Sequence, residues 1–344
     1  MLIRIGDAMV TIEEVAKYAG VSVATVSRVL NGTTVKPAAE EKVRSAIRDL
    51  NYIPNQSARN LRRNESCVIL TLAPNFSNPF YSHILTGIGD MAHGRGYSVL
   101  ICNSGGSADN ERHFLKMLDS HRADGAIVLG CHTDCGWLTD YARRFHIVQC
   151  CEYVPEVDCP SVSIDNYAAA LETVRYLRGL GHRRIAMLGA GNKYISTHLR
   201  REGYRDAMAE AGLPVPEGFY AEADADYSFT SGQAAAKRLM AQEDRPTAIF
   251  CVSDILALGA ISVAQEMGLS VPEDLTVTGF DDVDYTTMFH PYLTTVAQPC
   301  YEMGQKSLEL LVAMLRGKDT RPDGRNFVPY RFVERESSAP PEKA

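Results

Sequence analysis

The chain has 344 residues, of which 45% are hydrophobic and 22% charged, so it is long enough for two or three domains of ordinary globular composition. It contains no apolar run of the roughly 18 to 20 residues that a membrane-spanning helix needs, and its N-terminus lacks the apolar core of a signal peptide. These features exclude a membrane protein. We expect a cytoplasmic protein with no membrane partner and a leader, residues 1–9, without ordered structure, so that Met9 is a candidate natural start.

The charge is distributed unevenly along the chain. Residues 1–64 hold ten Lys/Arg and six Asp/Glu, a net charge of +4, whereas the whole chain has a net charge of −7. The remaining residues therefore carry −11. A small basic segment joined to a large acidic one indicates that the first binds a polyanion and the second does not.

The nine cysteines are an odd number and are spread over most of the chain, which favours reduced thiols over a disulfide framework. One group of cysteines, with a neighbouring histidine and aspartate, allows a zinc site as the alternative: Cys131, His132, Asp134, Cys135, Cys150, Cys151 and Cys159. No C-x2-C pair occurs, and Cys150 and Cys151 end an apolar run typical of a strand. We expect buried thiols, no metal and no cofactor.

Residues 10–54 carry the signals of three short helices. Thr11 and Glu14 form a capping box that begins the first helix, and Gly20 ends it. Ser22 caps a second helix, which Gly32 ends. A third helix begins with a proline at position 37. Two short helices joined by a tight turn and followed by a third predict a helix-turn-helix DNA-binding domain.

The second helix, within SVATVSRVLNG, is the candidate DNA-reading element. Its N-terminal end would face base edges in the major groove. Arg28 can form two hydrogen bonds with a guanine edge, and Val23 and Ala24 can contact only thymine methyl groups or respond to groove shape. The short donors of this stretch are candidate phosphate anchors: Ser22, Thr25, Ser27 and Asn31. The alternative is a solvated helix with incidental hydroxyl groups.

The stretch TIEEVAKYAGVSVATVSRVLNG, followed by LNYIPNQSARNLRRNES, resembles the DNA-binding head of the lac-repressor (LacI/GalR) family of bacterial transcription regulators. The resemblance implies further DNA contacts at Thr11 and Tyr52. One departure from the family pattern is the loop before the third helix, which is shorter and has Lys36 where the family often has a serine cap.

The resemblance also implies a hinge helix at residues 55–64 that folds only on operator DNA, paired with its twin. Asn55 would cap this helix, Ala58 would lie where the two hinge helices approach, and Leu61 would wedge into the minor groove. A lone helix this short is marginal in water, so a flexible linker is the alternative.

The body, residues 65–335, alternates short apolar runs with helical patterns, which predicts two parallel α/β lobes. We place lobe 1 at residues 65–163 plus 294–320, lobe 2 at residues 164–293 plus 321–335, and a disordered tail at residues 336–344. Ligands of such sheets bind beyond the carboxyl ends of the strands, here in the cleft between the lobes.

The body resembles the periplasmic-binding-protein-like effector domain of the same family. The matching stretches are NPFYSHILTGI, GLGHRRIAMLG, VSDILALGAI, VPEDLTVTGFDD and LTTVAQP. Within the family, RNES, DYSFTSG, SDILALGA and AQPCYEMG resemble the cytidine-responsive repressors.

The resemblance implies eight effector-binding positions: Phe80, Tyr81, Ser196, Arg200, Tyr227, Ser253, Asp254 and Asp281. Arg200 and Asp281 provide the donor and acceptor that neighbouring sugar hydroxyls need, and the aromatic residues provide a ring face. Helix capping is the alternative role for Asp254, and hinge packing is the alternative role for Tyr81.

An enzyme is the competing interpretation from another class, but the chain has no GxSxG, P-loop or HExxH motif and no catalytic residues stand out. Gly189-Ala-Gly191 weakly resembles a nucleotide-binding loop. Three acidic residues, Asp281, Asp282 and Asp284, could serve as ligands of a metal ion. An extracytoplasmic sugar-binding protein is the third interpretation. We expect instead a transcription regulator, not an enzyme, that binds a near-palindromic operator as a homodimer under the control of a small sugar or nucleoside.

Overall fold

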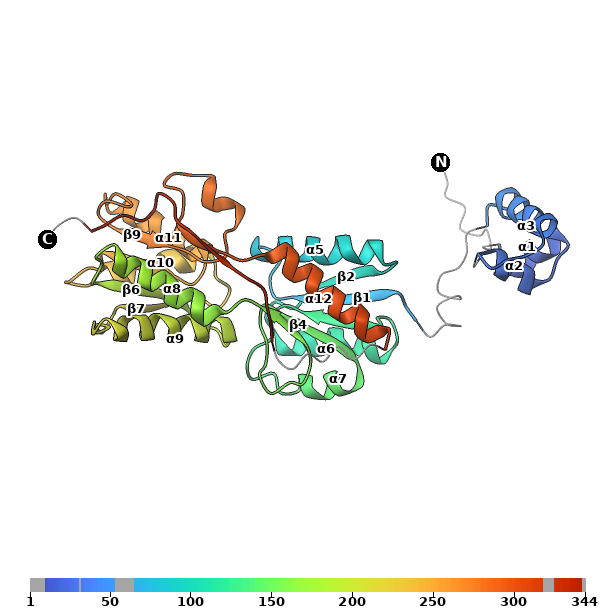
Figure 1. The fold of residues 1–344 in the computed structure, drawn as a ribbon, viewed down its shortest axis with the longest axis horizontal. Helices are drawn as coiled ribbons and strands as arrows, with labels where there is room; N and C mark the ends of the chain where they lie inside the picture. Colours follow the sequence, from blue (N-terminus) through green and yellow to red (C-terminus); the bar gives the residue numbers. More distant parts are fainter. Residues whose placement is uncertain (1–9, 31, 53–64, 318–324, 342–344) are drawn as a thin grey trace, which may run out of the picture. The chain divides into compact units, whose positions relative to one another are not determined.

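The computed structural model describes residues 10–30, 32–52, 65–317 and 325–341 (Figure 1). The chain divides into two compact units, residues 1–65 and residues 66–344, which we call the head and the body. Several predictions lie outside the described residues: the leader at residues 1–9, the hinge with Asn55, Ala58 and Leu61, and the phosphate anchor Asn31. Among the helices that are described, none is both long and apolar enough to cross a membrane.

The head consists of three helices, α1 (Ile12–Ala19), α2 (Val23–Leu30) and α3 (Pro37–Asp49). The predicted capping box is confirmed, since the Thr11 amide donates to Glu14 Oε2 at 2.7 Å and the Glu14 amide donates to Thr11 Oγ1 at 3.3 Å. Gly20 closes α1 in the left-handed region with φ 66°, a conformation that glycine adopts without steric cost. The most buried side chains of the head come from all three helices: Val15, Val26, Val43 and Ala46.

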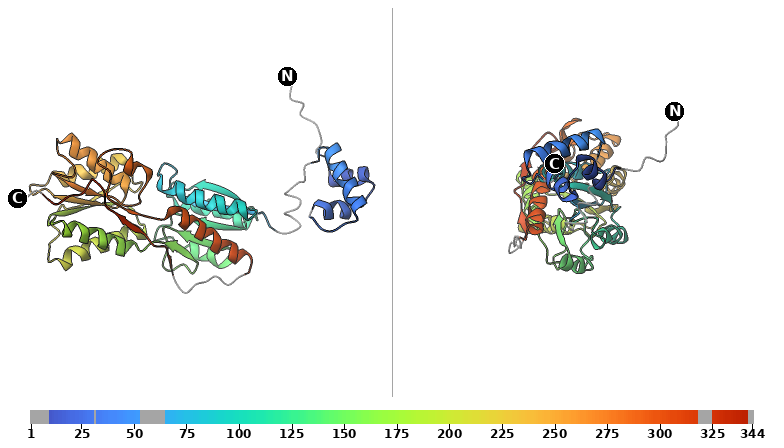
Figure 2. Two further views of the ribbon diagram at one scale, coloured as in Figure 1. Left: turned by 45° about the horizontal axis from the view of Figure 1, so that its top comes forward. Right: turned by 90° about the vertical axis from the view of Figure 1, so that its right-hand side faces the viewer.

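Lobe 1 of the body is a six-stranded parallel sheet in the order β11-β5-β4-β3-β1-β2. Its strands are β1 (Val68–Ala73), β2 (Ser98–Asn103), β3 (Gly125–Val128), β4 (His146–Cys150), β5 (Ser161–Ser163) and β11 (Asn326–Phe327). Its helices are α5 (Phe80–Gly94), α6 (Ala108–Asp119), α7 (Leu138–Arg144) and α12 (Cys300–Leu315). The helices α5 and α12 lie side by side (Figure 2) and, with α6 and α7, pack against the sheet.

Two glycines allow α5 and α12 to approach closely. A Cβ atom at Gly304 would lie 2.2 Å from the backbone oxygen of Ile84, and one at Gly87 would lie 2.2 Å from that of Tyr301. Since real Cβ atoms do not approach an oxygen so closely, any larger residue would force the helices apart. This contact fixes the last helix of the chain to lobe 1.

Lobe 2 is a four-stranded parallel sheet in the order β7-β6-β8-β9. Its strands are β6 (Ile185–Ala190), β7 (Tyr220–Ala223), β8 (Ala248–Cys251) and β9 (Thr276–Thr278). Its helices pack in two pairs, α8 (Asn166–Gly179) with α9 (Ile195–Glu210) and α10 (Phe229–Met240) with α11 (Asp254–Glu266). Because both sheets are parallel, the carboxyl ends of their strands can supply a common site.

The crossing segments correct one predicted boundary. The chain passes between the lobes after β5 and again along β10 (Thr295–Ala297), which pairs antiparallel with β12 (Arg331–Val333). The sequence predicts residues 321–335 in lobe 2, but β11 pairs with β5 in the sheet of lobe 1. A third crossing therefore follows β11, and the prediction was wrong because a two-residue strand leaves almost no periodicity in the sequence.

The predicted disordered tail is also corrected for residues 336–341. Ser337 is fully buried, its hydroxyl donates to the Val277 oxygen at 2.6 Å, and its backbone oxygen accepts from the Val277 amide at 2.9 Å. The Ala339 amide donates to Thr276 Oγ1 at 3.1 Å. The segment therefore lies along β9 like an added strand, which its small polar residues and prolines do not reveal in the sequence.

Candidate functional site

The second helix of the head exposes one face and buries the other. Val26 and Val29 are buried, whereas Ser22, Ala24 and Arg28 are exposed. The Ser22 hydroxyl accepts a hydrogen bond from the Thr25 amide at 3.2 Å and lies 2.9 Å from Thr25 Oγ1. The remaining predicted contacts on this helix are half-buried: Val23, Thr25 and Ser27.

This arrangement leaves Arg28 and the start of α2 accessible to a partner of the head. The helix N-terminus carries backbone amides and a positive partial charge, both of which attract phosphate. An exposed arginine on the same helix can read a base edge. The predicted DNA contacts within residues 22–28 therefore lie together on one short helix and its N-terminal end.

Thr11 and Tyr52 have structural roles in the head. The Thr11 side chain belongs to the capping box of α1. Tyr52 is 9% exposed and packs in the core of the head, and its amide donates to the Ile47 oxygen at 2.9 Å. The ring of Tyr52 thus packs inside the head, and a DNA contact of this residue stays a prediction.

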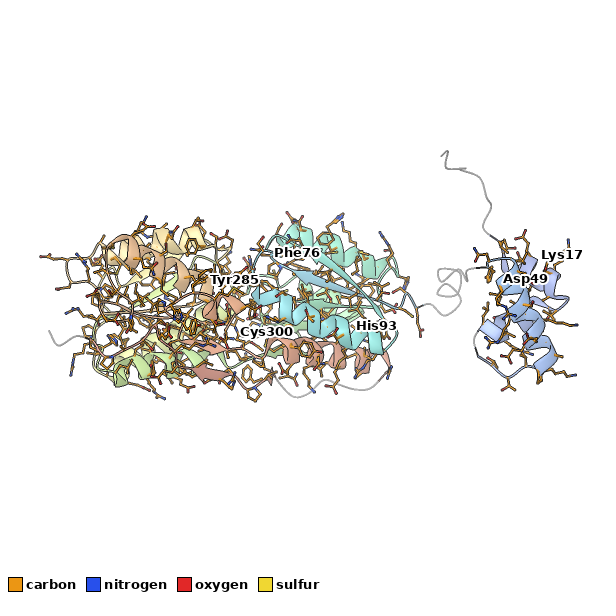
Figure 3. All side chains as sticks on the ribbon, turned by 90° about the horizontal axis from the view of Figure 1, so that it is seen from above. Lys17, Asp49, Phe76, His93, Tyr285 and Cys300 are labelled. Atoms are coloured by element: carbon orange, nitrogen blue, oxygen red, sulfur yellow. The ribbon has the colours of Figure 1, made fainter. Side chains whose placement is uncertain are left out.

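The body places seven of the eight predicted effector residues around one cavity between the lobes. The predicted residues that line it are Phe80, Tyr81, Ser196, Arg200, Tyr227, Ser253 and Asp281. The cavity has a volume of about 20 Å³. Its walls come from helices and strand ends of both lobes, as expected for the cleft of a two-lobed α/β body. Figure 3 shows Cys300, the first residue of α12, near the junction of the two lobes.

Arg200 is held rigidly in this cavity by uncharged groups. Its Nε donates to Asn166 Oδ1 at 2.9 Å, and its Nη1 donates to the Val252 oxygen at 2.5 Å. The guanidinium carbon lies 3.6 Å from the centre of the Phe280 ring. Because a guanidinium has five N–H donors, these two bonds orient it and leave donors for a ligand.

Asp281 lies beside Arg200 in strained backbone. Its Oδ1 is 3.9 Å from Arg200 Nη1 and accepts a hydrogen bond from Gln298 Nε2 at 2.8 Å. The φ angles of Asp281 and Asp282, 124° and 60°, fall in the region that favours glycine. Burial raises the pKa of Asp281, and the Arg200 guanidinium offsets this only in part. Strain and burial together are typical of a residue kept for its function.

A second carboxyl group, Glu152, joins the two lobes directly. It follows β4 in lobe 1, and it accepts hydrogen bonds from the Ser196 hydroxyl at 2.5 Å and the Ser196 amide at 3.1 Å in lobe 2. Burial raises the pKa of Glu152, while its hydrogen bonds with Ser196 and the charge of Arg200 lower it. The cavity therefore holds two carboxyl groups, Glu152 and Asp281, and one cation, Arg200.

Three aromatic residues form the apolar part of the wall. The rings of Phe80 and Tyr81 meet edge to face, with centroids 5.2 Å apart. The Tyr227 hydroxyl lies 2.6 Å from Thr197 Oγ1, and Tyr227 itself has a positive φ of 55°. Aromatic faces beside hydrogen-bonding groups are typical of sites that bind sugar or base rings.

Asp254 is the predicted effector residue that does not line the cavity. It is fully buried, and its carboxylate accepts hydrogen bonds from the Thr295 hydroxyl at 2.6 Å and the Val283 amide at 2.9 Å. Ser253, not Asp254, caps α11, since its side chain accepts from the Leu256 amide. Asp254 therefore joins the loop after β9 to the crossing strand, and the structure assigns it these contacts and not a place in the cavity wall.

Five cavity residues were missed by the sequence analysis: Asn78, Cys151, Glu152, Asn166 and Gln298. Two of them carried a usable signal. Glu152 comes two residues after Cys150, the last residue of the apolar strand HIVQC, and Gln298 lies in the crossing segment LTTVAQP. Asn166 and Gln298 act through Arg200 and Asp281, and such supporting contacts leave no spacing pattern in a sequence.

The nine cysteines do not gather with other metal-binding side chains in the described part of the chain. All nine are free thiols, most of them buried, and the described residues contain no group of three or more His, Cys, Asp or Glu side chains that could hold an ion. Cys151 contributes to the cavity wall as a small apolar group, and burial raises its pKa well above the usual thiol range.

Comparison with known proteins agrees with both units. The family of bacterial regulatory proteins called the lacI family matches residues 11–55, and a periplasmic binding protein-like domain matches residues 174–338. The transcriptional repressor CytR of Escherichia coli is 37% identical over 314 residues, which cover 91% of this chain and 92% of CytR. Catabolite control protein A of Priestia megaterium is 35% identical, covering 96% of this chain and 99% of that protein.

A solved structure supports the same assignment. The lac repressor dimer bound to operator and the anti-inducer ONPF superposes with a TM-score of 0.87 at 27% identity, covering 96% of this chain and 100% of the repressor chain. The chain belongs to the lacI family of bacterial transcription regulators. It is a DNA-binding regulator with a helix-turn-helix head and a two-lobed effector-type body, and it is not an enzyme.

Proposed function

We propose that the protein is a repressor that binds a near-palindromic operator as a homodimer in the cytoplasm and responds to a small uncharged sugar or nucleoside. Each chain carries one helix-turn-helix, so a two-fold dimer dictates a site with two half-sites. The solved lac repressor is titled as a dimer bound to operator, which supports this assembly. The effector would bind in the cavity that Arg200 and Asp281 line.

The observation that carries the effector proposal is the set of hydrogen-bonding groups contributed by the two lobes. Glu152 comes from lobe 1, whereas Ser196, Arg200 and Asp281 come from lobe 2. A ligand whose hydroxyl groups bond to the residues of both lobes has its highest affinity for the arrangement in which the lobes are close together. Differential affinity of this kind is what allows a ligand to shift a conformational equilibrium.

Two relatives support the class of ligand. One solved relative of 31% identity is titled as a regulator in complex with cellobiose, and another of 26% identity is titled as having bound ribose. In this chain, two buried carboxyl groups and one arginine suit a neutral molecule with several hydroxyl groups. An anionic ligand would meet an excess of acidic groups.

A thermal-shift screen of the full chain tests the proposal. A ligand that binds only the folded state raises the melting temperature, by an amount that grows with ligand concentration. We expect stabilisation by a nucleoside or a sugar from a panel of nucleosides, bases, pentoses and hexoses. The same ligand should change operator affinity, and the direction of the change distinguishes an inducer from a corepressor. No stabilisation by any compound of the panel would contradict the effector proposal.

A further inference from the structure

Two short loops join the lobes without taking part in the wall of the proposed effector cavity. One loop follows β3 in lobe 1, and the other connects β6 to α9 in lobe 2. The Thr133 amide and hydroxyl both donate to the backbone oxygen of Lys193, at 2.9 and 3.1 Å, and Lys193 Nζ donates to Asp134 Oδ2 at 2.6 Å. The rings of His132 and Tyr194 meet edge to face, with centroids 4.8 Å apart. We call residues 132–134 and 193–194 the clasp.

The clasp is exposed, and it is held in place by residues buried beneath it. The side chains of Lys193 and Asp134 are 66% and 56% exposed, and an exposed ion pair contributes little to stability by itself. On either side of the lobe 1 half of the clasp, Cys131 and Cys135 are buried. Both thiols pack in the core of lobe 1 together with apolar residues of α6. The position of the clasp therefore depends on the surroundings of these two anchors.

A carboxyl group lies beside these anchors without an ion-pair partner. Glu111, on α6 of lobe 1 (Figure 1), is 2% exposed. Its Oε2 accepts from Cys135 Sγ at 4.0 Å and its Oε1 accepts from the Ser104 hydroxyl at 3.5 Å, and both distances are long for a hydrogen bond. No lysine, arginine or histidine forms an ion pair with Glu111 in the part of the chain that the structure describes. An ionised carboxylate at this position would lack both water and a strong donor.

The titratable groups that face this carboxyl group carry no positive charge: Cys131 and Cys135 on the loop after β3, and Tyr194 in lobe 2. Burial raises the pKa of each of them, so they stay neutral at pH 7. The charge of Glu111 raises each pKa further, which places its carboxyl group close to both halves of the clasp. The charged residues next to it on α6, Asp109 and Arg112, pair with each other on the exposed face.

We propose that Glu111 makes the closure of the lobes sensitive to pH, because its protonated carboxyl group lets the clasp close and its ionisation opens the clasp. Burial raises the pKa of this group to about 7, and the pKa returns toward 4.5 when the clasp opens and water reaches the carboxylate. The group therefore favours closure fully below pH 4.5, and this contribution is lost as the pH rises through 7. The device acts on the arrangement of the lobes and needs no effector.

Hydrogen exchange of the full chain without any ligand tests this proposal. The Thr133 amide donates across the clasp, so its protection reports closure directly. Between pH 6 and pH 8, after correction for the intrinsic exchange rate, protection of the clasp amides in residues 129–137 should fall about tenfold in wild type. A group with a pKa of 4.5 in the open arrangement and about 7 in the closed one changes the ratio of the two by about this factor. The amides of β3 should stay at least about tenfold better protected, because the lobes open without unfolding.

Two variants separate Glu111 from other titrating groups. Glu111→Gln keeps the shape of the side chain but cannot ionise, so the protection of the clasp should be the same at pH 6 and pH 8. Ser104→Ala removes a hydroxyl group that lowers the pKa of Glu111, so the fall in protection should move to higher pH. Glu309→Gln, on the exposed side of α12, is the control and should behave like wild type.

Three results would overturn the proposal. Constant protection of the clasp from pH 6 to pH 8 in wild type would show that closure does not depend on pH. A fall in Glu111→Gln as large as in wild type would assign the pH dependence to another group, such as His132. Equal protection of the clasp and of β3 would show that pH acts only on unfolding of the body. None of these results bears on the proposed effector function, which the thermal-shift screen tests separately.

Discussion

The head and the body position their functional residues in different ways. In the head, the described candidate contacts of α2 fall within residues 22–28, and a capping box and a tight turn are enough to present them. In the body, the cavity draws on residues from Asn78 to Gln298, supplied by the strand ends of two sheets. The contacts of the head can therefore be predicted from local sequence, whereas the cavity of the body exists only once both lobes have folded.

The largest effect should follow from removing the cation of the body site. Arg200→Ala leaves Asp281 and Glu152 buried without their positive neighbour, and truncating one partner of a buried charge pair costs about 2–5 kcal/mol. We expect effector binding to be lost in calorimetric titrations while operator affinity without effector stays the same, because the head does not contain this residue.

Arg201→Ala is the matched control for that variant. Arg201 is the next residue of α9, is half exposed, and lies over the Tyr220 ring with its guanidinium carbon 4.1 Å from the ring centre. The Arg201→Ala variant should bind effector with the affinity of wild type. Retained effector binding in Arg200→Ala would mean that the cleft between the lobes is not the effector site.

The next largest effect concerns the pH dependence of the stability of the body. Burial raises the pKa of Glu111 on α6 from 4.5 to about 7, with the Ser104 hydroxyl 3.5 Å from its carboxyl group. Because the pKa of Glu111 is higher in the folded state, the protonated carboxyl group favours folding. Its contribution to the free energy of unfolding is complete below pH 4.5 and is lost as the pH rises through 7.

Glu111→Gln should remove this pH dependence. As the pH is raised from 4.5 to 8, the wild type should lose stability and the variant should not. The free energy of unfolding of the variant minus that of wild type should therefore rise by up to about 3 kcal/mol, since one pKa unit corresponds to about 1.4 kcal/mol. Denaturant unfolding of the body at several pH values measures the change, with the exposed Glu309→Gln as the reference variant. A constant difference between Glu111→Gln and wild type across this range would show that Glu111 does not titrate there.

A smaller effect is expected for the head, and it should be specific to sequence. Arg28→Ala removes an exposed guanidinium from α2 and should weaken operator binding by about 1–3 kcal/mol, with relaxed discrimination at one base pair per half-site. Binding assays on operator and on random DNA measure the difference. Arg44→Ala on α3 is the control, since Arg44 pairs with Glu40 at 2.7 Å. Equal losses on both DNAs would make Arg28 a phosphate anchor only.

The smallest effect tests how local the head is. Thr11→Ala removes the hydroxyl of the capping box and should destabilise α1 by about 1 kcal/mol. Faster hydrogen exchange should appear in the amides of α1 and leave β1 and β6 unchanged. Faster exchange spread over the amides of both head and body would show instead that the two units unfold together.

The sequence predicted much of the fold because its signals are periodic. The capping box, the three head helices and the parallel α/β alternation follow from spacing alone. Other features have no such signal. The two-residue strand β11 and the buried tail around Ser337 depend on pairing with distant strands. Asp254 and Ser253 both follow a strand, and only the folded chain shows that Asp254 accepts a hydrogen bond from Thr295 in the crossing segment.

The central claim is that a ligand in the body controls the DNA affinity of the head. Fluorescence anisotropy of labelled operator DNA, titrated with the full chain with and without cytidine, measures this coupling directly. We predict that a saturating nucleoside changes operator affinity by about 5- to 150-fold in wild type and has no effect in Arg200→Ala. An unchanged operator affinity with every nucleoside and sugar that binds, or the same change in Arg200→Ala, would contradict the account.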